Sequence, residues 1–294
     1  MDIDVVFSGG GIKGLALIGA YEMLEKKGFR FKRVAGTSVG SILAGFAAAG
    51  YSSNEIEMLL NETELKEFLD SRNVLLPMPI AKWLLLYWRM GLYKGNVFEE
   101  WLEKKLAAKG VYTFSDLPPN SFYVVASDLT NGRLLVLPDD LEEYGIPKET
   151  FPVARAIRMS SSLPYFFEPI KLRSLSGVNT IVDGGVLSNF PMWIFVKEGE
   201  PKIRPVLGIT LSSSQRERPK RVIKNAIQLF EALFITMKEA HDARYISRKH
   251  EKDIVFISIK EDLTTEFTIT PEKKDALIEI GRMKTNEFLK TWTY

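Results

Sequence analysis

Two glycine-rich turns, one helix apart near the start of the chain, constrain the fold more than any other feature. The first is Ser8-Gly9-Gly10-Gly11-Ile12-Lys13-Gly14 and the second is Gly36-Thr37-Ser38-Val39-Gly40. Each turn follows a short apolar run typical of a buried strand and precedes a longer apolar run with helical spacing, within residues 4–26 and 31–49. Two such units in succession predict the beginning of a layered α/β fold.

Strand and helix patterns continue to alternate along the rest of the chain. Residues 53–109 have helical patterns, and Asn96 is the expected N-cap of the last helix in that block. We therefore predict one α/β domain over residues 1–294, with helices on both faces of a central sheet and with residues 53–109 as a helical insertion or cap. The remaining expected strands lie at 122–126, 134–137, 180–182, 205–210 and 253–259, and the remaining helices at 153–159, 220–249 and 272–289.

The composition excludes several classes of function. The 294 residues are 46% hydrophobic and 26% charged, as expected for a globular chain with a sizeable core. The formal net charge of +2 gives no reason to expect nucleic acid as a partner, because such proteins usually carry a concentrated basic footprint. Cysteine is absent, so disulfides, thiolate metal sites and cysteine nucleophiles are excluded. Because the first residues are acidic and the apolar run after them is short, we expect no secretory signal and a cytoplasmic location.

One segment, residues 74–93, is apolar enough to raise the question of a membrane. Prolines, basic residues and a glycine interrupt it, so it falls short of the ~20 apolar residues that a spanning helix requires. Two interpretations stay open: a mobile cap that touches the bilayer, flanked by Lys82, Arg89 and Lys94, or a helix buried in its own domain. In the first interpretation the residues that line or cover an acyl-chain entry are Leu75, Leu76, Met78, Ile80, Trp83, Leu84, Leu85, Leu86, Tyr87, Trp88 and Met90.

The first glycine turn offers backbone amides to an anion. Without Cβ atoms, Gly9, Gly10 and Gly11 let a substrate oxygen approach the main chain, where N–H groups stabilise a developing negative charge. The same turn also fits a dinucleotide-binding pattern, which requires an acidic residue about 20 positions later. Lys32 and Arg33 stand there instead, so an NADP-binding oxidoreductase remains the alternative function.

The second glycine turn presents Ser38 as a candidate nucleophile. Glycines two positions before and after a serine remove side chains that would clash in a sharp strand-to-helix turn. Asp183, which precedes Gly184-Gly185 and follows an apolar run, is the expected base. The two histidines, His241 and His250, lie in a charged stretch that is typical of a solvated helix, which disfavours a Ser-His-Asp triad.

Taken together, these motifs resemble those of the patatin-like phospholipase family. The matches are Gly9-Gly10-Gly11-Ile12-Lys13-Gly14, Gly36-Thr37-Ser38-Val39-Gly40, the serine-rich stretch at residues 154–164, and Asp183-Gly184-Gly185, in family order. The resemblance implies a three-layer fold with a mostly parallel sheet and a helical cap. It also implies a lipid or ester substrate, hydrolysis without a cofactor or metal, Ser38 as nucleophile, Asp183 as base, and an oxyanion hole at residues 9–11. Acyl transfer to another alcohol stays open, because the same groups support it.

The chain departs from the family pattern at two positions of the first turn. Ser8 stands where the family commonly has aspartate, and Lys13 replaces the usual arginine. Lysine keeps the positive charge but lacks the planar fork of a guanidinium, so Lys13 is expected to contact the loop or a phosphate less specifically. Neither change removes a group that the chemistry requires.

Overall fold

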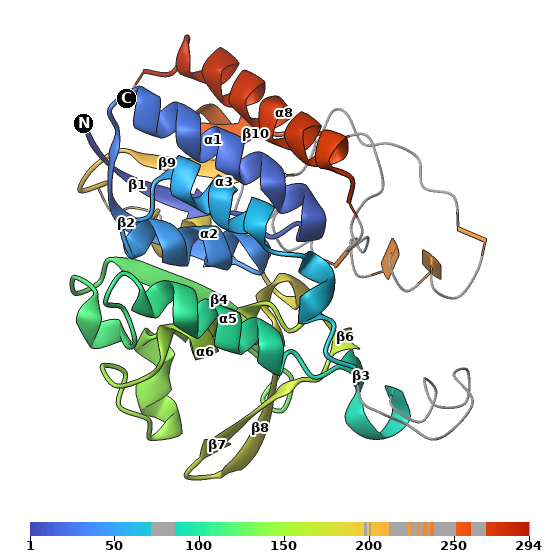
Figure 1. The fold of residues 1–294 in the computed structure, drawn as a ribbon. Helices are drawn as coiled ribbons and strands as arrows, with labels where there is room; N and C mark the ends of the chain where they lie inside the picture. Colours follow the sequence, from blue (N-terminus) through green and yellow to red (C-terminus); the bar gives the residue numbers. More distant parts are fainter. Residues whose placement is uncertain are drawn as a thin grey trace.

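The protein is a layered α/β structure built around one large sheet (Figure 1). The computed structural model describes residues 1–71, 86–196, 199, 201–211, 223–224, 228–229, 232–233, 236–237, 251–259 and 269–293. Within these residues eight strands form a sheet in the order β10-β9-β1-β2-β4-β8-β7, with β5 paired to β4. The strands are β1 (Asp2–Phe7), β2 (Arg30–Thr37), β4 (Phe122–Asp128), β5 (Arg133–Leu137), β7 (Ile170–Ser174), β8 (Gly177–Asp183), β9 (Val206–Thr210) and β10 (Ile254–Phe256).

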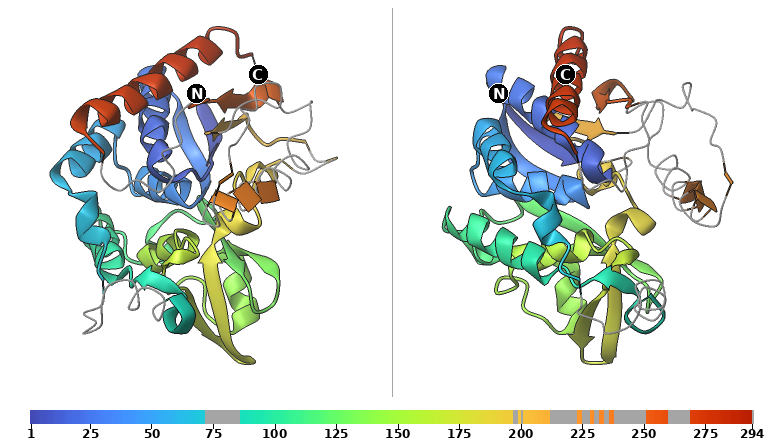
Figure 2. Two further views of the ribbon diagram at one scale, coloured as in Figure 1. Left: turned by 90° about the vertical axis from the view of Figure 1, so that its right-hand side faces the viewer. Right: turned by 45° about the vertical axis from the view of Figure 1, so that its right-hand side comes forward.

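The sheet has a parallel part and an antiparallel part. Strands β10, β9, β1, β2 and β4 run parallel to one another, whereas β5 and β8 pair antiparallel with β4 and β7 pairs antiparallel with β8. Strands β7 and β8 form a long hairpin that projects from the end of the molecule opposite α8 (Pro271–Leu289) (Figure 2). A separate parallel pair joins β3 (Gly91–Tyr93) to β6 (Tyr165–Phe167). The mostly parallel sheet flanked by helices confirms the predicted fold class.

The described helices pack mainly into one large core. The other α-helices are α1 (Leu15–Lys26), α2 (Val39–Ala48), α3 (Ser53–Glu62), α5 (Asn96–Ala107) and α6 (Val153–Ser160). Alternation along β1 separates the two faces of the sheet, because Val5 joins this core and Val6 joins a smaller one that includes Phe190. Short 3-10 turns occur at η1 (Gly11–Gly14), η2 (Leu65–Phe68), η3 (Phe114–Asp116), η4 (Asp139–Tyr144), η5 (Gly184–Val186), η6 (Met192–Ile194) and η7 (Glu251–Asp253).

The final helix closes the core over the first one, as both lie side by side in Figure 1. The contact is close because small residues face the partner backbone. A Cβ added at Gly281 would lie 1.8 Å from the carbonyl oxygen of Ala16, and one at Gly19 would lie 2.0 Å from that of Ile278. The end of the described chain therefore braces α1, the helix that follows the first glycine turn.

Several sequence expectations need correction or fall outside the described residues. Gly95, with φ 75°, occupies the N-cap of α5 in place of Asn96, because the carboxylate of Asp70 accepts from the first amides of the helix. The strands β3, β6 and β7 were not expected. The predicted helix at 220–249 lies largely outside the described residues, as do His241 and His250.

The block at residues 53–109 contains α3, η2, β3 and α5, with residues 72–85 outside the described chain. That it forms a cap within a single domain stays a prediction. Among the helices that the structure describes, none combines the length and the apolar character needed to span a bilayer.

Candidate active site

Ser38 lies in a strained turn between β2 and α2. Its φ of 54° and ψ of −128° are unusual for a residue with a side chain. The turn is tight enough to exclude side chains on both sides. A Cβ at Gly36 would lie 2.3 Å from the carbonyl oxygen of Gly40, and one at Gly40 would lie 2.4 Å from that of Phe7. The local sequence therefore forces the geometry that the motif predicts, with Ser38 at the N-terminus of α2.

The sheet brings the candidate base to the candidate nucleophile. Strand β2 runs parallel to β4 and ends with Thr37 opposite Val125. Strand β8 runs antiparallel to β4 and ends with Asp183 opposite Ala126, the next residue along β4. Strand β5 pairs with residues 124–128 of β4 and so occupies one edge of that strand. Strands β2 and β8 therefore share the opposite edge of β4, where the end of β2 meets the end of β8. Ser38 and Asp183 consequently border the same cavity.

The Asp183 carboxylate is buried and held by backbone groups. The residue is 3% exposed, and its Oδ1 accepts a hydrogen bond of 2.7 Å from the amide of Gly185. The amide of Asp183 donates to the carbonyl of Ser162 at 2.9 Å. A Cβ at Gly184 would lie 2.1 Å from the carbonyl oxygen of Val125, so the turn after Asp183 packs directly on β4. The glycines after Asp183 therefore fix the carboxylate in place.

The first glycine turn lies against the Ser38 elbow. A Cβ at Gly9 would approach Ser38 Cβ to 3.1 Å. The amide of Gly9 donates to the carbonyl of Asn189 at 3.0 Å, so it is already engaged. No hydrogen bond between described residues takes up the amides of Gly10 and Gly11, and both residues line the cavity. The amides available to a substrate oxygen in this turn are thus those of Gly10 and Gly11.

The two departures from the family motif have different structural settings. The buried Ser8 hydroxyl donates to the carbonyl of Gly9 at 3.1 Å and accepts from the amide of Leu211 at 3.0 Å. Ser8 therefore ties the glycine turn to the end of β9 without a carboxylate. Lys13 is half-buried in η1 and is not among the residues that line the cavity.

Two residues of the serine turn (residues 160–162), which ends α6, hold the two catalytic candidates. Ser160 Oγ accepts from the amide of Ser38 at 2.8 Å and donates to the carbonyl of Val125 at 2.6 Å. Ser162 holds the Asp183 amide through its carbonyl, and its hydroxyl donates to the carbonyl of Arg158 at 2.8 Å. The sequence analysis noted the serine-rich stretch only as a family resemblance. Its signal was three consecutive serines at a helix end, without any indication of their partners.

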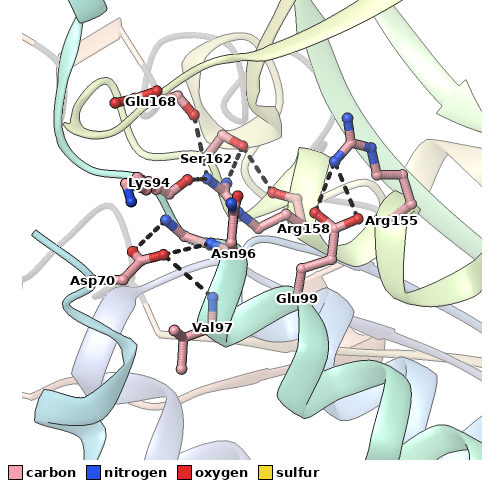
Figure 3. Close-up of polar contacts among 10 residues, drawn as sticks. Asp70, Lys94, Asn96, Val97, Glu99, Arg155, Arg158, Ser162 and Glu168 are labelled. Atoms are coloured by element: carbon pink, nitrogen blue, oxygen red, sulfur yellow. Dashed lines mark hydrogen bonds and ion pairs between the residues drawn. The ribbon is translucent and has the colours of Figure 1, made fainter. Parts of the chain in front are cut away.

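The buried side chain of Arg158 holds the serine turn through a hydrogen bond to Ser162 (Figure 3). Arg158 donates to the carbonyls of Lys94 and Gly95, at 2.7 and 2.9 Å, and to the hydroxyl of Ser162 at 2.5 Å. Its guanidinium also lies 4.8 Å from the ring centre of Phe167. Burial lowers the pKa of Arg158 to about 10, so the side chain remains charged at neutral pH. Arg158 therefore connects the start of α5 to the turn that holds Asp183.

The start of α5 has a second support in Figure 3. The carboxylate of Asp70 accepts from the amides of Gly95, Asn96 and Val97, at 2.5, 2.8 and 3.3 Å. The carbonyl of the same aspartate accepts from the amide of Lys94. A negative charge at a helix N-terminus is also favoured by the helix dipole. Both ends of the stretch between Asp70 and Lys94 are thus anchored together.

An apolar cavity of about 200 Å³ leads away from Ser38 and Asp183. One face of α2 forms part of the wall, and an aromatic group from η2 and α5 forms another part. The rings of Phe68 and Trp101 lie 5.1 Å apart between centres. The lining residues from α2, α3, η2 and α5 are Val39, Ile42, Leu43, Phe46, Ile56, Leu60, Leu65, Phe68, Phe98 and Trp101.

This wall differs from the lining that the sequence indicated. Of the expected entry residues, Leu86, Tyr87, Trp88 and Met90 are described, and none lines the cavity. The others lie in residues 72–85, outside the described chain. The apolar run after Ser38 forms a helix, as its spacing predicted. Its second role as a cavity wall was missed because other residues of that wall, such as Trp101 and Phe166, lie far away in the sequence.

The site shows little support for a dinucleotide. Arg33 donates to the carboxylate of Asp4, and Lys32 pairs with Asp2 at 3.4 Å. Asp4 lies opposite Arg33 in the interior of the β1–β2 pair, whereas the glycine turn begins beyond Phe7. The basic residues are therefore set back from the end of β2, where that interpretation needs them. Within the described chain, no group of three or more His, Cys, Asp or Glu side chains is arranged to hold a metal ion.

Comparison with known proteins decides the family. A family model described as patatin-like phospholipase matches residues 5–196, which contain both glycine turns, the serine turn and Asp183. The chain belongs to the patatin-like phospholipase family. Patatin-like phospholipases hydrolyse lipid ester bonds, and this chain is accordingly a lipid ester hydrolase.

Two relatives and one solved structure illustrate the range of similarity. An uncharacterized protein, YqhO of Bacillus subtilis, is 56% identical over 294 residues, which is 100% of both chains. The triacylglycerol lipase ptl3 of Schizosaccharomyces pombe is 26% identical over 193 residues, 65% of this chain and 38% of the lipase. The crystal structure of VipD from Legionella pneumophila aligns with a TM-score of 0.57 at 17% identity, covering 98% of this chain and 67% of VipD. The last comparison supports the patatin-like fold alone.

Proposed function

We propose that the protein is a serine-dependent lipid acyl hydrolase that acts through an acyl-Ser38 intermediate, with Asp183 as general base. One observation carries the proposal: a strained serine and a buried carboxylate border the same apolar cavity, beside two glycine amides that no described group occupies. Nucleophile, base, anion-binding amides and a binding space for an acyl chain are the parts that ester hydrolysis requires.

Each step of the proposed reaction uses a named group. Asp183 accepts the hydroxyl proton of Ser38 while Ser38 Oγ bonds to the ester carbonyl carbon. The amides of Gly10 and Gly11 donate to the resulting oxyanion. The bond to the alcohol oxygen then breaks, and Asp183 returns the proton to the departing alcohol. Water next gives a proton to Asp183 and attacks the acyl carbon. The bond from this carbon to Ser38 Oγ then breaks and releases the fatty acid, and Asp183 returns the proton to Ser38 Oγ.

Replacement of the two residues tests this assignment. We expect Ser38→Ala to lower ester hydrolysis by about 10⁴-fold or more and to abolish labelling by a fluorophosphonate probe. Asp183→Asn retains an oxygen that can accept from the Gly185 amide, so the fold should persist while hydrolysis falls by about 10³-fold. Thermal unfolding of both variants provides the control for folding. Full esterase activity in Ser38→Ala would reject the proposal.

The substrate's acyl chain is proposed to occupy the apolar cavity. Ile42, about one helical turn beyond Ser38, lines the cavity wall. Ile42→Trp should therefore lower kcat/KM for a long-chain ester by about tenfold or more and leave an acetate ester within about threefold. Ile42→Val, which leaves the space open, is the matched control. Equal losses on both esters would place the acyl chain elsewhere.

Water and another alcohol compete as acceptors in the second half of the reaction. An acceptor alcohol that enters in place of water converts hydrolysis into acyl transfer by the same steps. Mass spectrometry of the products formed with and without added glycerol distinguishes the two outcomes. We propose hydrolysis as the main reaction, because the triacylglycerol lipase ptl3 is 26% identical to this chain over 193 residues.

Peripheral contact with a lipid surface is a further part of the proposal. Tyr87 and Trp88 are 76% and 71% exposed, with ring centres 5.1 Å apart, and Arg89 follows them. Exposed aromatic residues beside a basic residue are typical of an interfacial contact. Replacing both aromatic residues by serine should weaken binding to anionic vesicles, with hydrolysis of a water-soluble ester unchanged. Tyr112→Ser, which removes an exposed tyrosine elsewhere, is the control, and unchanged vesicle binding in the double variant would reject the contact.

A further inference from the structure

The middle residue of the serine turn has no structural use for its hydroxyl. Ser160 holds the amide of Ser38, and Ser162 holds the amide of Asp183. Between them, Ser161 lines the cavity together with Ser38 and Asp183. Its Oγ is buried and has no hydrogen-bond partner in the described part of the protein.

The backbone around Ser161 is fully engaged, so the unused group is the side chain alone. The amide of Ser161 donates to the carbonyl of Ile157 at 3.0 Å, and its carbonyl accepts from the amide of Leu163 at 2.9 Å. A buried hydroxyl without a partner lowers stability, because it has lost its hydrogen bonds to water. Alanine would fill nearly the same space without this cost. Such a group in a native structure calls for an explanation outside folding.

The arrangement of the site limits which part of a bound ester Ser161 can meet. This step rests on the proposed function. The carbonyl oxygen faces the amides of Gly10 and Gly11, and the acyl chain enters the apolar cavity. The third substituent of the ester carbon is the alcohol oxygen, which must lie near Asp183 to receive its proton. In the sequence Ser161 lies between Ser160 and Ser162, which hold Ser38 and Asp183, and it borders the same cavity as both candidates.

We propose that Ser161 is a further catalytic residue, whose hydroxyl donates a hydrogen bond to the alcohol oxygen of the bound ester. As the bond between the carbonyl carbon and this oxygen breaks, the oxygen gains negative charge and then accepts the proton from Asp183. The Ser161 hydroxyl keeps its own proton and stabilises the charge during bond breaking. Ser161 therefore favours esters of poor leaving groups, such as glycerol, over esters of phenols that depart without help.

Two esters with the same acyl chain test this role in the full-length protein. The first is monooctanoylglycerol, with a poor leaving group, and the second is p-nitrophenyl octanoate, with a good one. We expect Ser161→Ala to lower kcat/KM by about tenfold or more on the glycerol ester and by less than about threefold on the phenyl ester. Its melting temperature should equal or exceed that of the wild type, because the variant removes an unpartnered buried hydroxyl.

Ser121 provides a matched control. Its Oγ is also buried without a partner among the described residues, but Ser121 lies just before β4 and does not line the cavity. Ser121→Ala should leave the ratio of the two kcat/KM values unchanged. A role of Ser161 in folding alone would lower stability in Ser161→Ala and reduce both activities together.

The outcomes separate this inference from the proposed function. Equal losses on both esters, no loss on either, or a lower melting temperature in Ser161→Ala would overturn the role of Ser161. If the wild type and Ser38→Ala hydrolyse both esters at the same rate, the proposed function fails, and the role of Ser161 fails with it. A selective loss on the glycerol ester, with the fold intact, supports both.

Discussion

The two halves of the candidate site are held together by different means. The nucleophile half consists of the glycine turn before η1 and the elbow around Ser38, all within the first 40 residues. Around Ser38 its contacts are between backbones, with gaps too small for a Cβ at Gly36 or Gly40. The base half comprises Asp183, the serine turn and Arg158. Gly184 makes one such backbone contact with Val125, but the other contacts of this half run largely through side-chain hydroxyls and a guanidinium.

This difference determines how each half responds to mutation. A backbone contact that excludes every side chain permits only glycine, and a substitution must displace main chain. A hydrogen bond from a hydroxyl can be lost with a small change of structure, at the cost of leaving its partner unpaired. We therefore expect the nucleophile half to fail through folding and the base half to fail in graded steps.

The largest effect is expected for Gly40→Ala. The added Cβ would lie 2.4 Å from the carbonyl oxygen of Phe7 and 2.5 Å from that of Ser8. Because both atoms are backbone, we expect a loss of about 4 kcal/mol or more in the free energy of unfolding. Urea unfolding measures this change. Gly50→Ala is the control: Gly50 has φ 83° with no atom within 4 Å of an added Cβ, so only about 1–2 kcal/mol of backbone strain is expected.

Similar destabilisation by Gly40→Ala and Gly50→Ala would contradict this expectation. It would mean that the turn around Ser38 relaxes as easily as an exposed loop. Retained hydrolysis in a folded Gly40→Ala variant would lead to the same conclusion.

A smaller effect is expected for Arg158→Met in the base half. The change leaves the carbonyls of Lys94 and Gly95 without their buried donor, so we expect a loss of about 3 kcal/mol in the free energy of unfolding. Hydrolysis should also slow, because Ser162 loses a partner while it holds the amide of Asp183. Arg155→Met is the control on the same helix. Arg155 is 35% exposed and pairs with Glu99, so its removal should cost less than about 1 kcal/mol.

Equal effects of the two arginine substitutions would show that the buried hydrogen bonds of Arg158 add no more to the free energy of unfolding than the partly exposed ion pair of Arg155. Denaturant unfolding combined with kcat on a short-chain ester distinguishes that result from the expected one.

The smallest effect is expected for Ser160→Ala, which removes the hydroxyl that joins the two halves. Its Oγ bridges the amide of Ser38 and the carbonyl of Val125, so we expect a loss of about 1–2 kcal/mol. The kcat for ester hydrolysis should fall several-fold, with KM unchanged, because the acyl cavity is not altered. An unchanged kcat would indicate that backbone packing of the elbow positions Ser38 without help from the base half.

The same division explains which features were predictable. The two strand-to-helix units predicted within residues 4–26 and 31–49 are present as β1 with α1 and β2 with α2, and their outer bounds differ from the prediction by at most two residues. Each follows from local patterns of apolar residues and glycines. The predicted N-cap of α5 was wrong, because Asp70, which accepts from the amide of Gly95, lies 25 residues earlier and no local pattern indicates this contact.

Local sequence was enough to indicate the family, the two glycine turns, and Ser38 and Asp183 as candidates, because backbone freedom and reactive groups depend on residue type within a few positions. The packing of distant segments placed β2 and β8 on one edge of β4, engaged the amide of Gly9 and buried Arg158. It also decided which residues line the cavity. These features depend on contacts between segments separated by tens to hundreds of residues, whose energies no local pattern records.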